Sequence, residues 1–239
     1  MVDRVRISVA MITYNGEAFL REQLASILSQ LSAEDELVIS DDGSTDGTLD
    51  IIKEFTEGHV PIRLLAGPGA GIKANMDHAL RHCAGKYIFL ADQDDVWAPN
   101  KVKEVLQCFK TEKASLVIHD AVVFTESIES PVMDSFFAFR NSGAGIIKNI
   151  WKNSYIGCCM AFRRELLKKA LPIPPKIEMH DQWLGILNDF YYKKSYFYHK
   201  PLLYYRRHRD NNSDMHRYGF FKMLRNRIVF LGFFIRRLF

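Results

Sequence analysis

The chain has few cysteines, and they follow no recognisable pattern. Cys83, Cys108, Cys158 and Cys159 contain no C-x-x-C pair and no spacing typical of metal ligands. Cys83 and Cys108 fall at apolar positions of expected helices, which favours buried free thiols. This cysteine usage is typical of a protein that works in a reducing cytoplasm.

Long hydrophobic runs and a strong net charge are also lacking. The longest apolar run near the C-terminus, residues 228–235, is far shorter than the ~20 residues that a membrane-spanning helix needs. The N-terminus enters a strand-like run without the apolar stretch of a signal peptide. A formal net charge of +4 is compatible with an anionic small substrate or an acidic membrane surface, and is too weak to suggest nucleic acid. We therefore expect a cytoplasmic protein with no nucleic-acid partner.

The first half of the chain alternates short apolar runs with helical periodicity. Strands are expected at 5–13, 37–39, 62–66 and 87–91, and amphipathic helices follow each of them. Such alternation predicts an α/β fold with a mainly parallel sheet that helices cover on both faces. Because ligands bind outside the carboxyl ends of parallel strands, we expect residues 13–15, 41–42 and 92–95 to meet in one crevice.

The second half is less regular. Strands are expected at 116–124, 155–162 and 195–205, with a helix at 163–170 and irregular structure with short helical pieces at 125–150. No repeat or long linker divides the chain, so one domain is expected over 1–216. Its first part, 1–112, would bind the ligand and its second part, 113–216, would form a mixed half that closes the site.

Three carboxylates stand within four residues at Asp92, Asp94 and Asp95. Such groups repel one another unless a cation or hydrogen-bond donors offset their charge. Hard oxygen ligands in this number are typical of Mg²⁺ or Mn²⁺ bound beside phosphate oxygens. The alternative is a solvated acidic turn that caps the next helix, and the position directly after a buried strand argues against it.

The order and spacing of three motifs resemble the family-2 glycosyltransferases of GT-A fold, over about the first 110 residues. The motifs are Ser8-Val9-Ala10-Met11-Ile12-Thr13-Tyr14-Asn15, Ser40-Asp41-Asp42-Gly43-Ser44-Thr45-Asp46 and Asp92-Gln93-Asp94-Asp95-Val96-Trp97. The resemblance implies that Thr13 and Tyr14 hold the base, that Asp41 contacts a pyrimidine, and that Asp92 and Asp94 bind ribose and a metal ion. Lys73 and Asn75 would reach the ribose or phosphates, although their segment departs from the commoner Gly-Ala-Arg-Asn pattern. The expected nucleotide-sugar-binding residues are Thr13, Tyr14, Asn15, Glu17, Asp41, Asp42, Lys73, Asn75, Asp92 and Gln93.

The second half holds the expected base. Family members carry it as an acidic residue before a helix and an aromatic, and Asp181 of Met179-His180-Asp181-Gln182-Trp183 matches that pattern. A helix cap is the structural alternative for Asp181, and the pair His119-Asp120 is the next candidate. The segment Tyr204-Tyr205-Arg206-Arg207-His208 resembles the family's Tyr-Arg-x-His segment, which implies His208 as a third metal ligand and an arginine that pairs with phosphate.

The C-terminal segment 217–239 is expected to be a basic amphipathic helix. Six Lys or Arg and no acidic residue stand between Met215 and Phe239, among many bulky apolar residues. This pattern is typical of a helix on an anionic membrane surface, such as the inner face of the cell membrane. Packing of the apolar face on the protein's own core or on a second subunit, as in a homodimer, is the alternative.

The combined prediction is a metal-dependent, inverting glycosyltransferase that uses Mg²⁺ or Mn²⁺. It would move a sugar from a UDP- or dTDP-linked donor to a hydroxyl of a glycan or lipid-linked acceptor in bacterial surface polysaccharide synthesis. The Asp-Gln-Asp-Asp-x-Trp form resembles rhamnosyltransferases. A catalytically inactive sugar-nucleotide-binding module of the same fold is the alternative. A dinucleotide-binding oxidoreductase is excluded, because the Gly-rich stretch 67–71 lacks G-x-G-x-x-G and follows the third strand.

Overall fold

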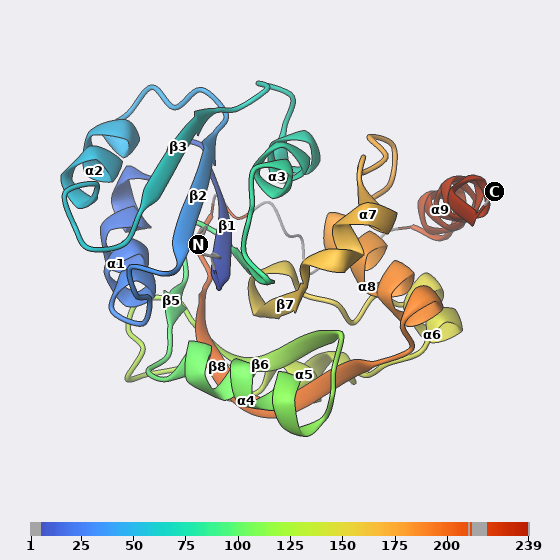
Figure 1. Ribbon diagram of the computed structural model, residues 1–239. Coiled ribbons are helices and arrows are strands. Elements are labelled where there is room, and N and C mark those ends of the chain that lie inside the picture. Colours follow the sequence, from blue (N-terminus) through green and yellow to red (C-terminus); the bar gives the residue numbers. More distant parts are fainter. Residues whose placement is uncertain (1–5, 210, 212–218, 239) are drawn as a thin grey trace.

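Eight strands form one mixed sheet in the computed structural model, which describes residues 6–209, 211 and 219–238 (Figure 1). The strands are β1 (Ile7–Thr13), β2 (Glu36–Asp41), β3 (Ile62–Ala66), β4 (Tyr87–Ala91), β5 (Val96–Trp97), β6 (Leu116–Phe124), β7 (Met160–Arg163) and β8 (Ser195–Arg206). Their order across the sheet is β3-β2-β1-β4-β7-β6-β8-β5. Val5, the first residue of the expected strand 5–13, lies outside the described residues.

The four strands of the first half run parallel to one another, as the continuous apolar runs predict. Beyond β4 in the sheet, β7 runs antiparallel to its neighbours β4 and β6, β8 runs parallel to β6, and β5, which belongs to the first half of the chain, runs antiparallel to β8. The expectation of an α/β fold with a mostly parallel sheet and a mixed second half is therefore confirmed.

Helices cover the sheet and lie beyond its second half. They are α1 (Glu17–Leu28), α2 (Thr48–Phe55), α3 (Ile72–Arg81), α4 (Lys101–Thr111), α5 (Phe136–Arg140), α6 (Ile146–Trp151), α7 (Leu167–Ala170), α8 (His180–Tyr191) and α9 (Phe220–Leu238), with short 3₁₀ turns at Gly157–Cys159 and Arg164–Leu166. Figure 1 shows α1 and α2 on one side of β1–β3 and α3 on the other. All seven residues of β1 are buried between these layers.

The strand order reverses at β1. The chain moves outward from β1 to β2 and β3, and then returns to add β4 on the opposite side of β1. The carboxyl ends of β1 and β4 are therefore neighbours, and this is the position where open α/β sheets bind ligands. The segments 13–15 and 92–95 follow these two strands.

Three details of the fold differ from the sequence expectation. Strand β5 was not expected, because two residues are too short to carry a periodic pattern, and it forms by pairing with β8. The expected strand 155–162 is a 3₁₀ turn followed by the short β7, and the expected helix 163–170 is a 3₁₀ turn followed by α7.

One face of α9 packs on the protein itself. Phe230 and Phe234 are 2% and 8% exposed, and the ring of Phe230 lies 5.8 Å from that of Trp183 in α8. The Arg237 guanidinium donates hydrogen bonds to the carbonyls of Leu171 and Pro172. The helix expected at 217–239 is thus present over Phe220–Leu238, while Arg217 and Phe239 lie outside the described residues. No helix in the described part of the chain is long and apolar enough to cross a membrane.

All four cysteines are buried and unpaired, as the sequence indicates. Burial raises the pKa of the Cys108 thiol to about 11, which keeps it protonated at neutral pH. These side chains therefore behave as small apolar groups.

Candidate active site

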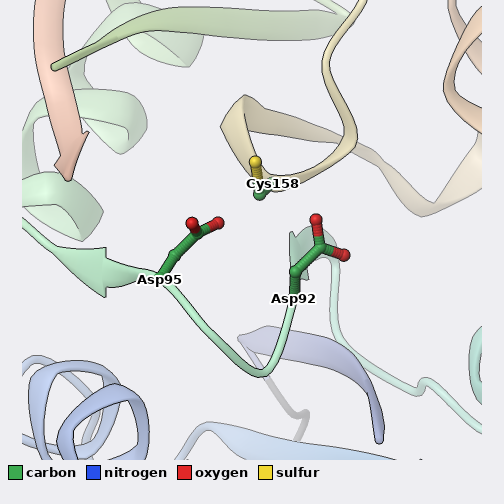
Figure 2. A group of neighbouring side chains, drawn as sticks. All are labelled: Asp92, Asp95 and Cys158. Carbon is green, nitrogen blue, oxygen red and sulfur yellow. The ribbon is translucent and has the colours of Figure 1, made fainter. Parts of the chain in front are cut away.

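The acidic loop 92–95 begins where β4 ends. One ligand atom each of Asp92, Asp95 and Cys158 lie within 4.8 Å of one another. Figure 2 shows both carboxylates on the side of the loop that faces Cys158. Asp92 is half-buried, whereas Asp95 and Cys158 are buried. Of the three acidic residues of the loop, Asp92 and Asp94 are therefore partly exposed, and Asp95 is buried.

Asp94 points to a different group of side chains. Its Oδ2 atom lies 2.9 Å from His208 Nε2 and 3.1 Å from Asn211 Nδ2. The Asp94 and His208 side chains are 16% and 18% exposed, so both reach the surface. The ring of His208 also packs against Phe19, with 4.6 Å between ring centroids. The predicted pair of metal ligands Asp94 and His208 thus lies together.

Burial and mutual repulsion disfavour the ionised form of the carboxylates of Asp92 and Asp95. Burial, followed by the charges of Asp94 and Asp181, raises the pKa of Asp92 above its ordinary value. Burial, followed by the charges of Asp94 and Asp92, raises the pKa of Asp95 well above its ordinary value. The Asp95 Oδ2 atom has no hydrogen-bond partner among the described residues. A site of this kind is stabilised by a bound cation.

Lys101 supplies the one fully buried amino group beside this loop within the described chain. It is 1% exposed, donates a hydrogen bond of 2.9 Å to the Cys158 carbonyl, and lies 4.1 Å above the Trp97 ring. Burial lowers the pKa of Lys101 to about 8, while the charges of Asp95 and Asp92 act to raise it. Sequence reasoning missed this residue. The available signal was a lysine at an inward position of α4, in line with Val102, Val105 and Phe109.

Gln93 and Arg206 fix the shape of the loop. The Gln93 amide accepts a hydrogen bond from the Tyr14 N–H and donates one to the Tyr14 carbonyl, at 2.8 and 3.0 Å. Arg206 donates from Nε to the Asp94 carbonyl and from its backbone N–H to Asp95, and its guanidinium pairs with Glu22. Gln93 therefore binds the protein backbone. Arg206, a candidate for pairing with phosphate, instead contacts Asp94, Asp95 and Glu22.

Asp41 is buried, and its carboxylate already accepts hydrogen bonds from other groups of the protein. Its Oδ2 accepts from the hydroxyls of Thr13 (2.7 Å) and Ser44 (2.6 Å), and its Oδ1 accepts from the N–H groups of Gly43 and Ser44. Two carboxylate oxygens offer about four acceptor positions, so these four bonds fill them. A base N–H can reach Asp41 only after a hydroxyl of Thr13 or Ser44 turns away.

Asn15, Glu17 and Asp42 also hold backbone in place. Asn15 accepts from the Thr45 N–H, and Glu17 accepts from the Gly47 N–H. Asp42 accepts from the N–H groups of Gly69 and Gly71, at 2.7 and 2.8 Å. These three predicted ligand residues shape the loops around β1 and β2. Their direct contact with a nucleotide sugar stays a prediction.

Tyr14 differs from its neighbours because its side chain is 59% exposed. Asn75, in contrast, is 2% exposed, and its Nδ2 donates to the Ser40 carbonyl at 2.9 Å. Gly67 packs so closely here that a Cβ atom at this position would lie 2.6 Å from the Asp41 carbonyl oxygen. Tyr14 is therefore available for stacking, whereas Asn75 lies beneath the surface.

Lys73 joins the two halves of the molecule. Its Nζ donates to the Ile177 carbonyl at 2.6 Å. Its charge lies near His180, where burial and then Lys73 lower the pKa of the imidazole to about 4. His180 is therefore neutral at physiological pH, and its Nε2 has no hydrogen-bond partner in the described structure.

Asp181 stands in the first turn of α8, is 4% exposed, and lies close enough to Asp92 to raise its pKa. It accepts hydrogen bonds from the Gln182 N–H and the Asn153 amide, the latter at 3.1 Å. Burial raises the pKa of Asp181 to about 7 although these bonds act in the opposite direction. Sequence reasoning missed Asn153 and Asn211, because loop residues carry no periodic signal.

The rival pair His119 and Asp120 is buried, at 1% and 3% exposure. The Asp120 carboxylate accepts from the Ser135 hydroxyl at 2.5 Å and from the Phe137 N–H at 2.8 Å, at the start of α5. Burial and the charge of Lys101 lower the pKa of His119 well below its ordinary value. Both side chains therefore have structural roles in this conformation.

The donor set of the site fits a divalent cation. Asp94 and His208 offer a carboxylate and an imidazole together at the surface, and the mutual repulsion of the carboxylates favours added positive charge. Asp92 instead lies beside Asp95 and Cys158, so the three predicted ligands Asp92, Asp94 and His208 do not form one close group among the described residues. The group Asp92, Asp95 and Cys158 is a poorer fit for a hard ion, because a hydrogen bond with Cys159, followed by burial, raises the pKa of the Cys158 thiol well above its ordinary range.

The switch point of the sheet lies beside an acidic loop and a buried carboxylate, which is where open α/β sheets bind ligands. The family model for glycosyl transferase family 2 matches residues 8–171. The chain therefore belongs to glycosyl transferase family 2.

Three curated relatives align with most of the chain. An uncharacterized glycosyltransferase of Nostoc sp., alr2836, is 29% identical over 87% of this chain and 66% of its own length. The dTDP-rhamnosyl transferase RfbG of Shigella flexneri is 28% identical over 84% of this chain and 72% of its own. The UDP-Glc:alpha-D-GlcNAc-diphosphoundecaprenol beta-1,3-glucosyltransferase WfgD of Escherichia coli is 28% identical over 79% of this chain and 72% of its own. The chain thus spans about two thirds to three quarters of their length.

Solved structures show the same GT-A fold. Residues 1–349 of TarS from S. aureus, in complex with UDP-GlcNAc, superpose with a TM-score of 0.73 at 18% identity, over 95% of this chain and 66% of that one. Glucosyl-3-phosphoglycerate synthase from Mycobacterium tuberculosis, in complex with Mn²⁺, UDP and glucosyl-3-phosphoglycerate, gives 0.59 at 17% identity, over 97% and 79%. The predicted family and the predicted fold are confirmed.

Proposed function

We propose that this enzyme moves a sugar from a UDP- or dTDP-linked donor to a hydroxyl of a lipid-linked glycan, with inversion at the anomeric carbon. The observation that carries the proposal is that the turn 157–158 lies between Asp181 and Asp92: a Cβ atom at Gly157 would lie 3.9 Å from the Asp181 Cβ, and the ligand atoms of Cys158 and Asp92 lie within 4.8 Å of each other. A base and a donor site that face each other are what a direct displacement requires. The names of RfbG and WfgD support the donor and acceptor classes.

The donor would bind across the ends of β1 and β4. Tyr14, with its exposed ring, would stack on the base, and Thr13 would turn its hydroxyl from Asp41 to admit a pyrimidine N–H. Asp92 would hold the ribose and, together with Asp94 and His208, a divalent cation. When bound, Mg²⁺ or Mn²⁺ offsets the charge of the departing nucleoside diphosphate. The Mn²⁺ complex of glucosyl-3-phosphoglycerate synthase supports this assignment.

Asp181 would accept the proton of the acceptor hydroxyl. With a pKa of about 7, its carboxylate is both substantially ionised and a stronger base than an exposed aspartate at neutral pH. The bonds from Asn153 and Gln182 hold it in one orientation, which lowers the entropic cost of attack. Inversion follows when the base and the leaving group lie on opposite faces of the sugar.

The test compares donor binding with transfer in Asp181→Asn. Calorimetry with UDP- and dTDP-sugars should give donor affinity within a few-fold of wild type, while transfer falls about 10²-fold or more. Transfer that survives within a few-fold would place the base elsewhere. Donor binding by the wild type without any turnover, across a panel of acceptors, would instead support the inactive binding module.

A further inference from the structure

The outer face of α9 carries an apolar stripe. Its members recur every three or four residues and so lie on one side of the helix. They are Phe221 (84% exposed), Leu224 (39%), Ile228 (62%), Leu231 (38%) and Ile235 (53%). The inner face of α9 already packs on α8 through Phe230 and Phe234. The stripe is therefore a second apolar face on a helix that is fixed to the protein.

Helix α6 extends this stripe. Ile147 and Trp151 are 86% and 58% exposed. The Arg227 guanidinium of α9 donates to the Trp151 carbonyl, so the end of α6 lies against α9 at this point. Leu224 and Leu231 stand one turn before and after Arg227, on the same flank of the helix. The two helices thus form one surface, which we call the α6–α9 face.

The charges that the two helices carry themselves have one sign, and Glu178, which precedes α8, pairs with Arg227 at 3.7 Å and accepts a hydrogen bond from Asn226. Residues 219–238 contain five basic side chains and no Asp or Glu, and residues 143–153 contain Lys148 and Lys152 and again no acid. Lys152, Arg225 and Arg236 are exposed. Bulky apolar groups flanked by cations are typical of helices that lie in the interface of an anionic bilayer.

We propose that the α6–α9 face seats in the headgroup region of an anionic lipid bilayer, with α9 lying flat along the surface. The 19 residues of α9 would extend about 28 Å in the membrane plane. Charge complementarity favours lipid over a second copy of this chain. A symmetric pairing would place the exposed Arg225, which flanks the stripe, near basic residues of the other copy.

This seating would deliver a lipid-linked acceptor to the base, a consequence that rests on the proposed function. Trp151 stands two residues before Asn153, whose amide donates to the Asp181 carboxylate at 3.1 Å. The residues that follow α6 therefore contact Asp181 through the Asn153 side chain. An acceptor anchored in the same leaflet would need to extend only a short distance.

Vesicle co-sedimentation of the whole chain tests the proposal. Vesicles of phosphatidylcholine alone should bind little, and vesicles with phosphatidylglycerol should bind strongly at low salt and weakly at high salt. The triple variant Lys152→Gln, Arg225→Gln, Arg236→Gln should weaken this binding about a hundredfold. A control with the same charge change on exposed α4-side lysines, Lys103→Gln, Lys110→Gln, Lys113→Gln, should bind like wild type.

A second variant tests the apolar part. Ile147→Ser with Ile228→Ser should weaken vesicle binding at least tenfold and leave the urea-unfolding midpoint near that of wild type, because both side chains are largely exposed. Three results would each overturn the proposal. The first is an equal loss of vesicle binding in the triple control variant that contains Lys103→Gln, and the second is that wild type does not bind anionic vesicles. The third is a dimer that forms without lipid and that Ile228→Ser dissociates. Donor hydrolysis with soluble nucleotide sugars is measured in parallel, so a failure of membrane binding is distinguishable from a failure of the enzyme assignment.

Discussion

Asp181→Asn should gain stability relative to wild type as the pH rises from 5 to 8. The Asp181 side chain is 4% exposed, and burial raises its pKa from an ordinary 3.8 to about 7. The folded state therefore holds the proton more tightly than the unfolded state. Stability falls as the pH rises from the unfolded pKa to the folded pKa, and the loss is complete above about pH 7.

The magnitude follows from the two pKa values. Each unit between them corresponds to about 1.4 kcal/mol, so wild type loses roughly 3 kcal/mol between pH 5 and pH 8 through this one group. Asparagine does not titrate, and its carbonyl oxygen can still accept the Gln182 N–H bond. The difference in unfolding free energy between Asp181→Asn and wild type should therefore grow by roughly 3 kcal/mol in favour of the variant.

Urea unfolding at pH 5, 6, 7 and 8, in the presence of a chelator, measures this difference. The matched control is Asp50→Asn, whose side chain is 81% exposed in its pair with Lys53 and should give a nearly constant difference. A difference for Asp181→Asn that stays constant within about 0.5 kcal/mol across this range would refute the inference that Asp181 is a buried base.

Three further outcomes are expected. Donor turnover should stop in EDTA and return with Mn²⁺ or Mg²⁺, and Asp94→Ala should fold but be nearly inactive; full activity in chelator would contradict the metal role. Gly67→Ala should lower stability by about 1–3 kcal/mol, because the new Cβ would lie 2.6 Å from the Asp41 carbonyl oxygen, and an unchanged melting temperature would argue against this packing. Phe230→Ala should cost about 3–5 kcal/mol in urea unfolding, and a cost below 1 kcal/mol would show that α9 does not pack as described.

Strands β1, β2 and β4 were predictable because each is a short apolar run that is buried on both faces of the sheet, and β3 was predictable from its apolar run although it is partly exposed. The bounds of β3, β4 and β6 coincide with those expected. Strand β5 was not predictable, because its two residues are held by β8, which lies about a hundred residues further along the chain. The proximity of residues 13–15 to residues 92–95 was predictable from topology alone. The two segments follow β1 and β4, which are neighbouring parallel strands.

The internal contacts of the site were not predictable. The sequence places Asp41 at a strand end, but only the fold shows that Thr13, Gly43 and Ser44 already occupy its carboxylate. Lys101 gave a weak signal, as a charge on the inward side of a helix. Its hydrogen bond to the Cys158 carbonyl joins residues that are 57 positions apart in the sequence. A local sequence pattern cannot predict a contact between residues so far apart.

The most direct test of the proposed activity is a turnover screen across UDP- and dTDP-sugars with Mn²⁺, with release of the nucleoside diphosphate as the readout. We expect at least one donor to be turned over slowly to water and faster with a lipid-linked acceptor. Asp92→Asn should abolish both activities, while Asp50→Asn retains them. Absence of nucleoside diphosphate release from every donor, together with no donor binding by calorimetry, would contradict the assignment of the 92–95 loop as a sugar-nucleotide site.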